Sequence, residues 1–237
     1  EGANYIAREI AQTIREKQKA GRFCVLALPG GDSPRHVYTE LIRMHKEEGL
    51  SFRNVIVFNM YEYYPLAPDA VNSNFNALKN MLLDHIDIDK QNIFTPDGSI
   101  AKDTIFEYCR LYEQRIESFG GIDIALLGIG RVGNIAFNEP GTPFGSVTHI
   151  VDLTESTIKD NSRLFKNIDE VPRQAFTMGL KNIMNAKKIL ILANGANKAK
   201  AVYGLVKGEV TEKLPASVLQ LHPDCTLVCD EVAAEFL

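Results

Sequence analysis

The hydrophobic residues of this 237-residue chain follow two patterns that alternate along the sequence. One is typical of amphipathic helices: residues 2–20 carry Ile6, Ile10 and Ile14 at helical spacing. The other is a short, nearly continuous apolar run, as in residues 22–28, which is typical of a strand buried on both faces. The two patterns alternate through almost the whole chain.

Further strands are predicted at 53–60, 121–129, Ala175–Met178, Lys188–Ala193 and Thr226–Cys229. Further helices are predicted directly after Pro34 and at 72–86, 101–119, 196–207 and 216–221. Strands that alternate with helices indicate βαβ units and therefore a mainly parallel sheet. The predicted fold class is α/β, a three-layer α/β/α sandwich. No repeat or Pro-, Gly- or Ser-rich linker divides it, so residues 1–237 are predicted to form one domain.

The composition excludes several classes of protein. Hydrophobic residues make up 45% of the chain and charged residues 24%, which is enough for a sizeable core without disulfides or metals. No apolar run approaches the roughly 20 residues of a membrane-spanning helix, so no membrane partner is expected. Lys and Arg number 26 against 30 Asp and Glu, a net charge of -4, and this lack of a basic surplus argues against nucleic acid as a partner.

The cysteines and the first residue bear on location and processing. Cys24, Cys109, Cys225 and Cys229 are expected to be reduced thiols of a cytoplasmic protein. The pair Cys225 and Cys229 has no matching second pair, so no metal site is predicted. The chain begins at Glu1 without a signal-peptide pattern, and we expect it to be a trimmed form or a fragment of a longer protein.

Chemistry is expected at the turns that follow strands, because ligands of parallel α/β sheets bind beyond the carboxyl ends of the strands. The first such turn, residues 29–34, reads Pro-Gly-Gly-Asp-Ser-Pro and leads into a helix. Gly30 and Gly31 let backbone N–H groups approach a ligand, and a helix N-terminus favours an anion. The spacing fits neither a Walker loop nor a dinucleotide fingerprint. The alternative is a plain turn in which Asp32 or Ser33 caps the helix.

A second turn and two isolated cations are also candidates. Residues 58–65 read Phe-Asn-Met-Tyr-Glu-Tyr-Tyr-Pro at the end of a strand. There, Glu62 beside Tyr61 is either a tuned acid or base or part of an aromatic lid. Arg163 lies in a polar segment and Lys198 follows a strand, so both are candidates for binding an anion, with ordinary solvated side chains as the alternative.

A third turn, residues 128–140, reads Gly-Ile-Gly-Arg-Val-Gly-Asn-Ile-Ala-Phe-Asn-Glu-Pro and contains G-x-G-x-x-G after a strand. A dinucleotide site needs an acidic residue about 20 residues further on, and Asp152 lies near that distance. However, Pro140 and Pro143 interrupt any helix between the two. NAD is therefore not predicted.

Together these segments resemble the glucosamine-6-phosphate deaminase (isomerase) family, and the resemblance covers nearly the whole chain. Its most specific part is Phe-Asn-Met-x-Glu-Tyr followed by Gly-x-Gly-x-x-Gly-x-Ile-Ala-Phe-Asn-Glu-Pro. The resemblance implies a modified Rossmann α/β/α sandwich and a role in amino-sugar phosphate metabolism. It also implies the family's reaction, which needs no cofactor. The ring of glucosamine 6-phosphate opens, a proton moves between C2 and C1, and ammonia leaves to give fructose 6-phosphate.

The resemblance places a sugar phosphate at one end of the site. The residues that match the family's phosphate site are Gly30, Gly31, Asp32, Ser33, Arg163 and Lys198. The family's loop normally reads Thr-Gly-Gly-Thr-Pro or Thr-Gly-Ser-Thr-Pro, so Gly30 and Asp32 depart from it. Asp32 adds a negative charge beside the phosphate and is expected to weaken binding.

Three of the family's proton-transfer positions are substituted. The proton-transferring Asp is Tyr61 here, and the ring-opening His is Asn134. The Asp or Thr two residues before that His is Val132, and only Glu139, the third member of the relay, matches. A phenol with a pKa near 10 is protonated at pH 7, an amide exchanges no proton, and valine has no polar atom. We therefore predict that deamination is weak or absent.

Three functions stay open on this basis. An isomerase of an amino-sugar or sugar phosphate needs Glu62 or Glu139 as its base. A sugar-phosphate-binding or regulatory relative keeps the fold without catalysis. A hydrolase resembling 6-phosphogluconolactonase, which shares the fold, ranks last because that family also relies on a His where Asn134 stands. Whether the chain is an enzyme, and whether it forms a homo-oligomer, also stay open.

Overall fold

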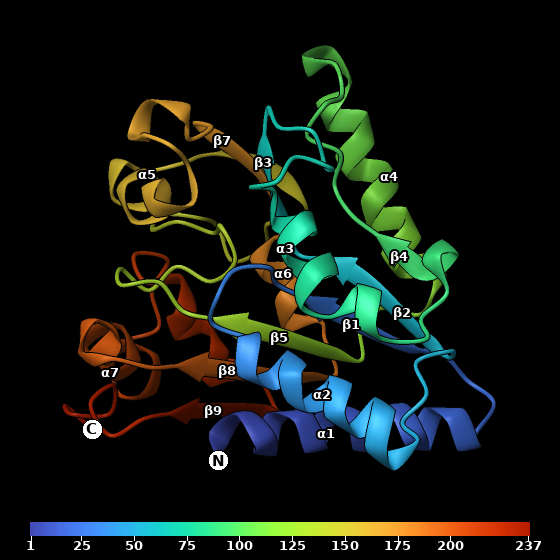
Figure 1. Ribbon diagram of the computed structural model, residues 1–237. Coiled ribbons are helices and arrows are strands. Elements are labelled where there is room, and N and C mark those ends of the chain that lie inside the picture. Colours follow the sequence, from blue (N-terminus) through green and yellow to red (C-terminus); the bar gives the residue numbers. More distant parts are fainter.

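The computed structural model describes all residues, 1–237, and its centre is a six-stranded parallel sheet (Figure 1). The strands are β1 Cys24–Leu28, β2 Val55–Asn59, β4 Ile93–Phe94, β5 Ile124–Gly128, β8 Lys188–Ala193 and β9 Cys225–Cys229. They lie in the order β4-β2-β1-β5-β8-β9, and every neighbouring pair is parallel. The predicted α/β class with a mainly parallel sheet is confirmed.

Helices cover both faces of this sheet (Figure 1). One face carries α1 (Gly2–Lys19), α2 (Arg35–Glu48) and α3 (Asn74–Met81), and the other carries α4 (Ile105–Ser118), α6 (Leu180–Met184) and α7 (Ala199–Val206). Alternate residues of β1 belong to opposite cores, with Ala27 on one side and Leu26 and Leu28 on the other. This two-sided burial explains why the strand is apolar throughout.

Several predicted helices are divided or differently wound. The helix predicted over 72–86 is α3 followed by a 3-10 turn at Leu83–His85, and the one predicted over 216–221 is a 3-10 helix, Pro215–Leu221. Ser73 starts α3, because its hydroxyl accepts a hydrogen bond from the Asn76 N–H at 2.9 Å. None of the helices has the length and apolar character needed to cross a membrane.

A second, antiparallel sheet stands beside the first and appears above it in Figure 1. It consists of β3 (Tyr61–Tyr64), β7 (Gln174–Thr177) and β6 (His149–Asp152), in the order β3-β7-β6. Of these strands only β7 was predicted. β3 escaped prediction because a single residue, Met60, separates it from β2, so its tyrosines resemble a turn. The short helix α5 (Glu155–Asn161), which follows β6, was also missed.

A buried aspartate holds the start of the parallel sheet together. The Asp123 carboxylate accepts hydrogen bonds from the Val25 N–H at 2.8 Å and from Lys187 Nζ at 3.0 Å, and it lies 3.3 Å from Lys17 Nζ. Burial alone raises the pKa of Asp123, but these partners outweigh burial and hold the pKa below its ordinary value. The carboxylate thereby links β1, the residue before β8, and α1.

We expect Asp123→Asn to lower the free energy of unfolding by about 3 kcal/mol at pH 7, because it leaves two ammonium groups and a backbone N–H without their anion. Since the folded-state pKa is lowered, the stabilisation is present above the ordinary Asp pKa and is lost as the pH falls through the folded-state value. Urea unfolding at pH 7 and below pH 4 measures this, and the loss should shrink in acid. The exposed Asp84→Asn is the control, and equal effects of the two variants would contradict the assignment.

Candidate functional site

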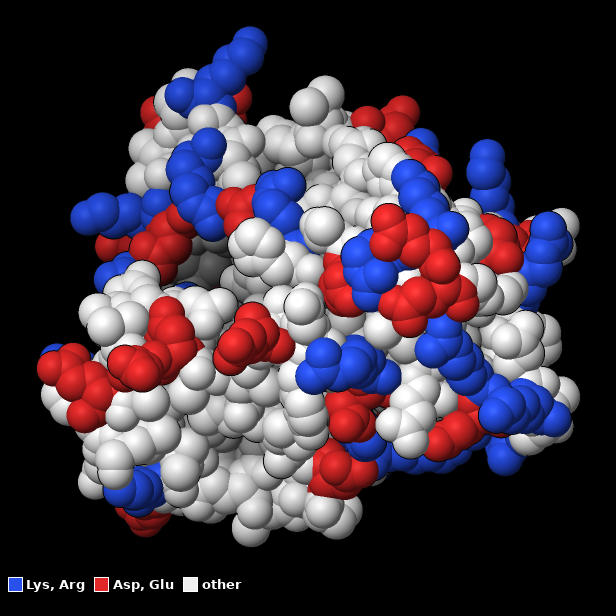
Figure 2. Space-filling view, turned by 60° about the horizontal axis from the view of Figure 1, so that its bottom comes forward, with Lys and Arg blue, Asp and Glu red and all other residues white.

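A cavity of about 210 Å³ lies at the carboxyl ends of β1 and β5. Residues 29–34 and 126–132 form two of its walls, and residues around α5 together with Lys198 close the others. Figure 2 shows a hollow on the face that it presents, rimmed by both basic and acidic side chains. The predicted site residues that line the cavity are Gly30, Gly31, Asp32, Ser33, Tyr61, Val132, Asn134, Arg163 and Lys198.

The loop after β1 owes its shape to its two glycines. A Cβ at position 30 would lie 2.5 Å from the backbone oxygen of Asn74, and Gly31 has φ +83°, which disfavours other residues. The alternative in which Asp32 or Ser33 caps α2 is wrong, because no side chain accepts a hydrogen bond at that helix start. Asp32 instead pairs with Arg35 at 2.9 Å and with Arg163 at 3.7 Å.

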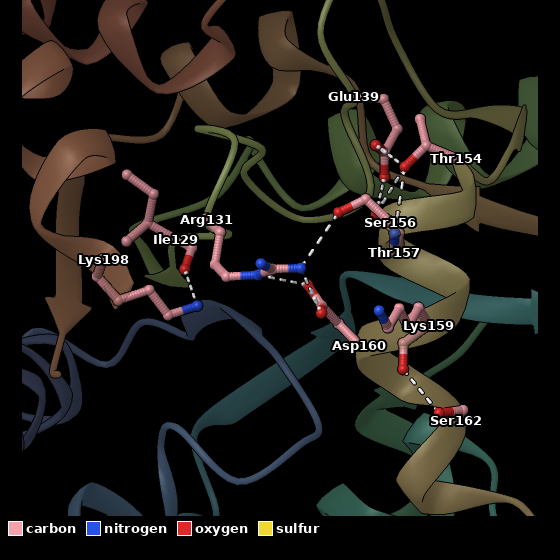
Figure 3. A network of polar contacts seen from close by, with 10 residues as sticks. All are labelled: Ile129, Arg131, Glu139, Thr154, Ser156, Thr157, Lys159, Asp160, Ser162 and Lys198. Atoms are coloured by element: carbon pink, nitrogen blue, oxygen red, sulfur yellow. Dashed lines mark hydrogen bonds and ion pairs between the residues drawn. The ribbon is translucent and has the colours of Figure 1, made fainter. Parts of the chain in front are cut away.

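Three cations converge on the cavity. Lys198 Nζ donates a hydrogen bond to the backbone oxygen of Ile129 at 2.7 Å (Figure 3). Burial lowers the pKa of Lys198, the nearby Arg131 and Arg163 lower it further, and Asp160 opposes them. A cluster of this kind attracts an anion, because a bound anion relieves the repulsion among the cations.

Sequence reasoning missed Arg131 and Asp160. The Arg131 guanidinium binds the Asp160 carboxylate through two hydrogen bonds of 2.6 and 3.0 Å, and it donates a longer one to Ser156 (Figure 3). The pair joins the loop after β5 to α5 across the cavity wall. Two signals were available: Arg131 lies inside the glycine pattern, and Asp160 lies three residues before Arg163.

Tyr61, Val132 and Asn134 give the cavity no group that titrates near neutral pH. The Tyr61 hydroxyl donates to the backbone oxygen of Gly30 at 3.4 Å, and its ring lies 4.6 Å from that of Phe137. Burial, with a smaller effect from Glu62, raises the pKa of Tyr61 above its ordinary value, so the phenol stays protonated at neutral pH. Val132 and Asn134 also line the cavity and supply no titratable group.

Glu62 does not line the cavity. Its buried carboxylate accepts hydrogen bonds from the backbone N–H groups of Tyr63 at 2.9 Å, Asn74 at 3.0 Å and Phe75 at 2.9 Å. Burial raises the pKa of Glu62 to about 7, although these three donors act in the opposite direction. The carboxylate ties β3 to the start of α3, so the geometry assigns it to the scaffold rather than to acid–base work.

Glu139 also lies outside the cavity lining, and its carboxylate accepts hydrogen bonds there. One carboxylate oxygen accepts the Thr157 hydroxyl at 2.7 Å, and the other accepts the Thr154 hydroxyl at 3.0 Å (Figure 3). Thr154 is also the residue that caps α5, since its hydroxyl accepts the Thr157 N–H. Glu139 therefore anchors the helix that carries Asp160.

No three His, Cys, Asp or Glu side chains come together as a metal site. All four cysteines are free, and burial raises the pKa of the Cys24 thiol to about 12. Among the histidines, the buried His222 bonds through Nε2 to the backbone oxygen of Ala186 at 2.6 Å, a structural contact. No histidine lines the cavity.

Glu62→Gln is expected to destabilise the fold by about 1–3 kcal/mol in mild acid, because an amide nitrogen cannot accept a backbone N–H, whereas either oxygen of the carboxyl group can. A pKa raised to about 7 means that the folded protein holds a proton that the unfolded chain releases above pH 4.5. Wild-type stability then falls as the pH rises to 7, by up to about 1.4 kcal/mol per pH unit from this group. Urea unfolding from pH 4.5 to 8 should show the variant's deficit shrinking with pH, whereas a growing deficit would place the folded pKa below the ordinary value.

Residues 1–228 match the family described as glucosamine-6-phosphate isomerases/6-phosphogluconolactonase. The chain is 45% identical over 237 residues to the glucosamine-6-phosphate deaminase of Mycoplasma mycoides, covering 100% of this chain and 95% of that protein. It is 70% identical over 230 residues to a glucosamine-6-phosphate deaminase-like protein of Bacteroides thetaiotaomicron. That match covers 97% of this chain and 35% of the relative, so the chain spans about a third of the relative's length.

Solved structures show the same likeness. A monomeric glucosamine-6-phosphate deaminase superposes with a TM-score of 0.95 at 43% identity, covering 100% of this chain and 96% of the other. The 6-phosphogluconolactonase from Trypanosoma brucei superposes with a TM-score of 0.76 at 21% identity, covering 99% and 95%. The second likeness is one of fold alone.

Proposed function

The chain belongs to the glucosamine-6-phosphate isomerase/6-phosphogluconolactonase family, and on this premise we propose that it binds an amino-sugar phosphate but deaminates it weakly or not at all. One observation carries the proposal: cations converge on the cavity while its proton-transfer positions hold Tyr61, Val132 and Asn134. Both halves of the proposal concern the same cavity, so binding and turnover can be tested separately.

Binding is supported by the charges around the cavity. A phosphate placed near Gly31 and Ser33 meets Lys198 and Arg163, and charge-assisted contacts to phosphate are among the stronger hydrogen bonds in proteins. Asp32 opposes this, because its carboxylate already lies 3.7 Å from Arg163. Both partners are more than half exposed, so this ion pair is weak and a dianionic phosphate can displace it.

The proposal of slow turnover is supported by the contacts that the carboxylates in and near the cavity already make. Within the cavity lining the carboxylates are Asp32 and Asp160, and each is paired with arginine. The two glutamates of the family's motifs, Glu62 and Glu139, form hydrogen bonds at the start of α3 and of α5 instead. A general acid or base typically contributes about 10²–10⁴-fold to a rate, so losing such groups removes most of the turnover.

For binding, glucosamine 6-phosphate should raise the melting temperature of the protein. Lys198→Ala should weaken the affinity by about 10–100-fold, the worth of one charge-assisted hydrogen bond. Asp32→Ser should strengthen it, because the phosphate then meets no competing carboxylate. Isothermal titration calorimetry measures both changes.

The matched control for this binding experiment is Lys200→Ala, which removes an exposed lysine of α7 that lies outside the cavity lining. Equal affinities of Lys198→Ala and Lys200→Ala would remove Lys198 from the site. A protein that shows no response to glucosamine 6-phosphate at all would overturn the proposed function.

For turnover, the native chain should release ammonia and fructose 6-phosphate far below ordinary enzyme rates of about 1–10³ s⁻¹. The triple variant Tyr61→Asp/Val132→Asp/Asn134→His should gain at least about 10²-fold, since it restores groups that can exchange protons. A coupled assay for fructose 6-phosphate reports both.

The double variant Tyr61→Asp/Val132→Asp is the control, because it leaves the position of the ring-opening residue unrestored. Ordinary turnover by the native chain would refute the inactivity proposal. A triple variant that still binds glucosamine 6-phosphate but gains no rate would refute the assignment of the loss to these three positions.

A further inference from the structure

A second cavity, of about 550 Å³, adjoins the first on the side of α2 and α3. Its walls include Thr39 and Ile42 of α2 and Asn76, Ala77 and Asn80 of α3. No Phe, Tyr or Trp offers a ring for stacking on a base, and the polar side chains of the lining are Thr39, Asn72, Ser73, Asn74, Asn76 and Asn80 together with Asp32, Arg35 and His85. Such a lining suits a neutral, hydroxyl-rich ligand better than a nucleobase.

The two cavities share four wall residues: Gly31, Asp32, Asn74 and Leu164. Asn74 stands out among them, because its side chain is 5% exposed and its buried Nδ2 has no hydrogen-bond partner. Native proteins rarely bury an unpaired donor, since doing so costs about 1–3 kcal/mol.

The backbone of Asn74 is fixed from two sides, so its amide is held in place between the cavities. Its N–H donates to Glu62 at 3.0 Å, and its carbonyl oxygen packs directly against Gly30. The first backbone N–H groups of α3 already have hydrogen-bond acceptors. The side-chain amide of Asn74 is the donor there that has none.

Asp32 is the movable part of the shared wall. Its contacts are ion pairs with Arg35 and Arg163, and all three side chains are more than half exposed. Exposed pairs contribute about 0–1 kcal/mol, so a phosphate that takes Arg163 separates it from Asp32 at little cost and leaves Asp32 paired with Arg35 alone. Asp32 and Asn74 both line the two cavities.

We propose that the two cavities are the two halves of one elongated site for a phosphorylated saccharide of at least two sugar units. This inference rests on the proposed function. The phosphate and its sugar occupy the first cavity beside Lys198 and Arg163, and the next sugar lies between α2 and α3. Asn74 contacts the ligand at the junction and determines specificity for the longer ligand.

The test compares dissociation constants, by calorimetry, for glucosamine 6-phosphate, chitobiose phosphorylated at O6 of one or the other sugar, and unphosphorylated chitobiose. One of the phosphorylated disaccharides should bind at least about tenfold more tightly than glucosamine 6-phosphate. Thr39→Trp, which fills the second cavity, should abolish that gain and leave the affinity for glucosamine 6-phosphate unchanged. Asn74→Ala should reduce the gain by about 5–10-fold.

The control is His36→Trp, on the same helix but lining neither cavity, which should preserve the gain. If glucosamine 6-phosphate binds and both phosphorylated disaccharides bind no more tightly, the elongated site is refuted while the proposed function stands. The elongated site is also refuted if the Thr39→Trp variant still binds a phosphorylated disaccharide more tightly than glucosamine 6-phosphate. If no phosphorylated sugar binds, the proposed function fails and this inference fails with it.

Discussion

Neighbouring parallel strands end at the same edge of a sheet, and the site depends on this constraint acting on β1 and β5. Leu26 pairs with Ile124 and Ala27 with Ala125, so the loops that leave these strands emerge side by side. One loop brings Gly31 and Asp32, and the other brings Arg131. Asp123 fixes the opposite ends of the same two strands through the Val25 N–H. The distance between the two walls of the cavity is thus set deep in the core rather than by contacts between the loops.

Two buried glutamates of the family's motifs hold structural elements in place. Glu62 binds the first backbone N–H groups of α3, and Glu139 binds the threonines that begin α5. Both helices border the cavity, so the carboxylates control its shape without lining it. The two glutamates thus have a structural role that does not depend on whether any reaction takes place in the cavity.

Five strands of the parallel sheet and the loops of the first cavity were predictable from sequence, because apolar runs mark those strands. The sixth, β4 (Ile93–Phe94), was missed, since it has two residues and is only partly buried. The second sheet was not, since β3 begins one residue after β2 and β6 spans only His149–Asp152. Two of the three cations were predicted: Arg163 and Lys198 matched the family, while Arg131, between the glycines of the loop after β5, was missed. Neither the orientation of Glu62 nor the unpaired amide of Asn74 has a signature in the sequence, because both depend on which backbone groups the fold brings near.

The hold of Glu139 on α5 limits which carboxylate could orient a histidine placed in the cavity. A histidine introduced at position 134 needs a carboxylate partner, and Glu139 already gives its two oxygens to Thr154 and Thr157. Recruiting it would loosen the helix whose Asp160 steadies Arg131. A carboxylate placed at position 132, on the same loop, would leave the Thr154 cap of α5 and its contact with Glu139 intact. Glu139 cannot both hold α5 and serve a histidine at position 134, so the rigidity of the wall and acid–base chemistry compete for one side chain.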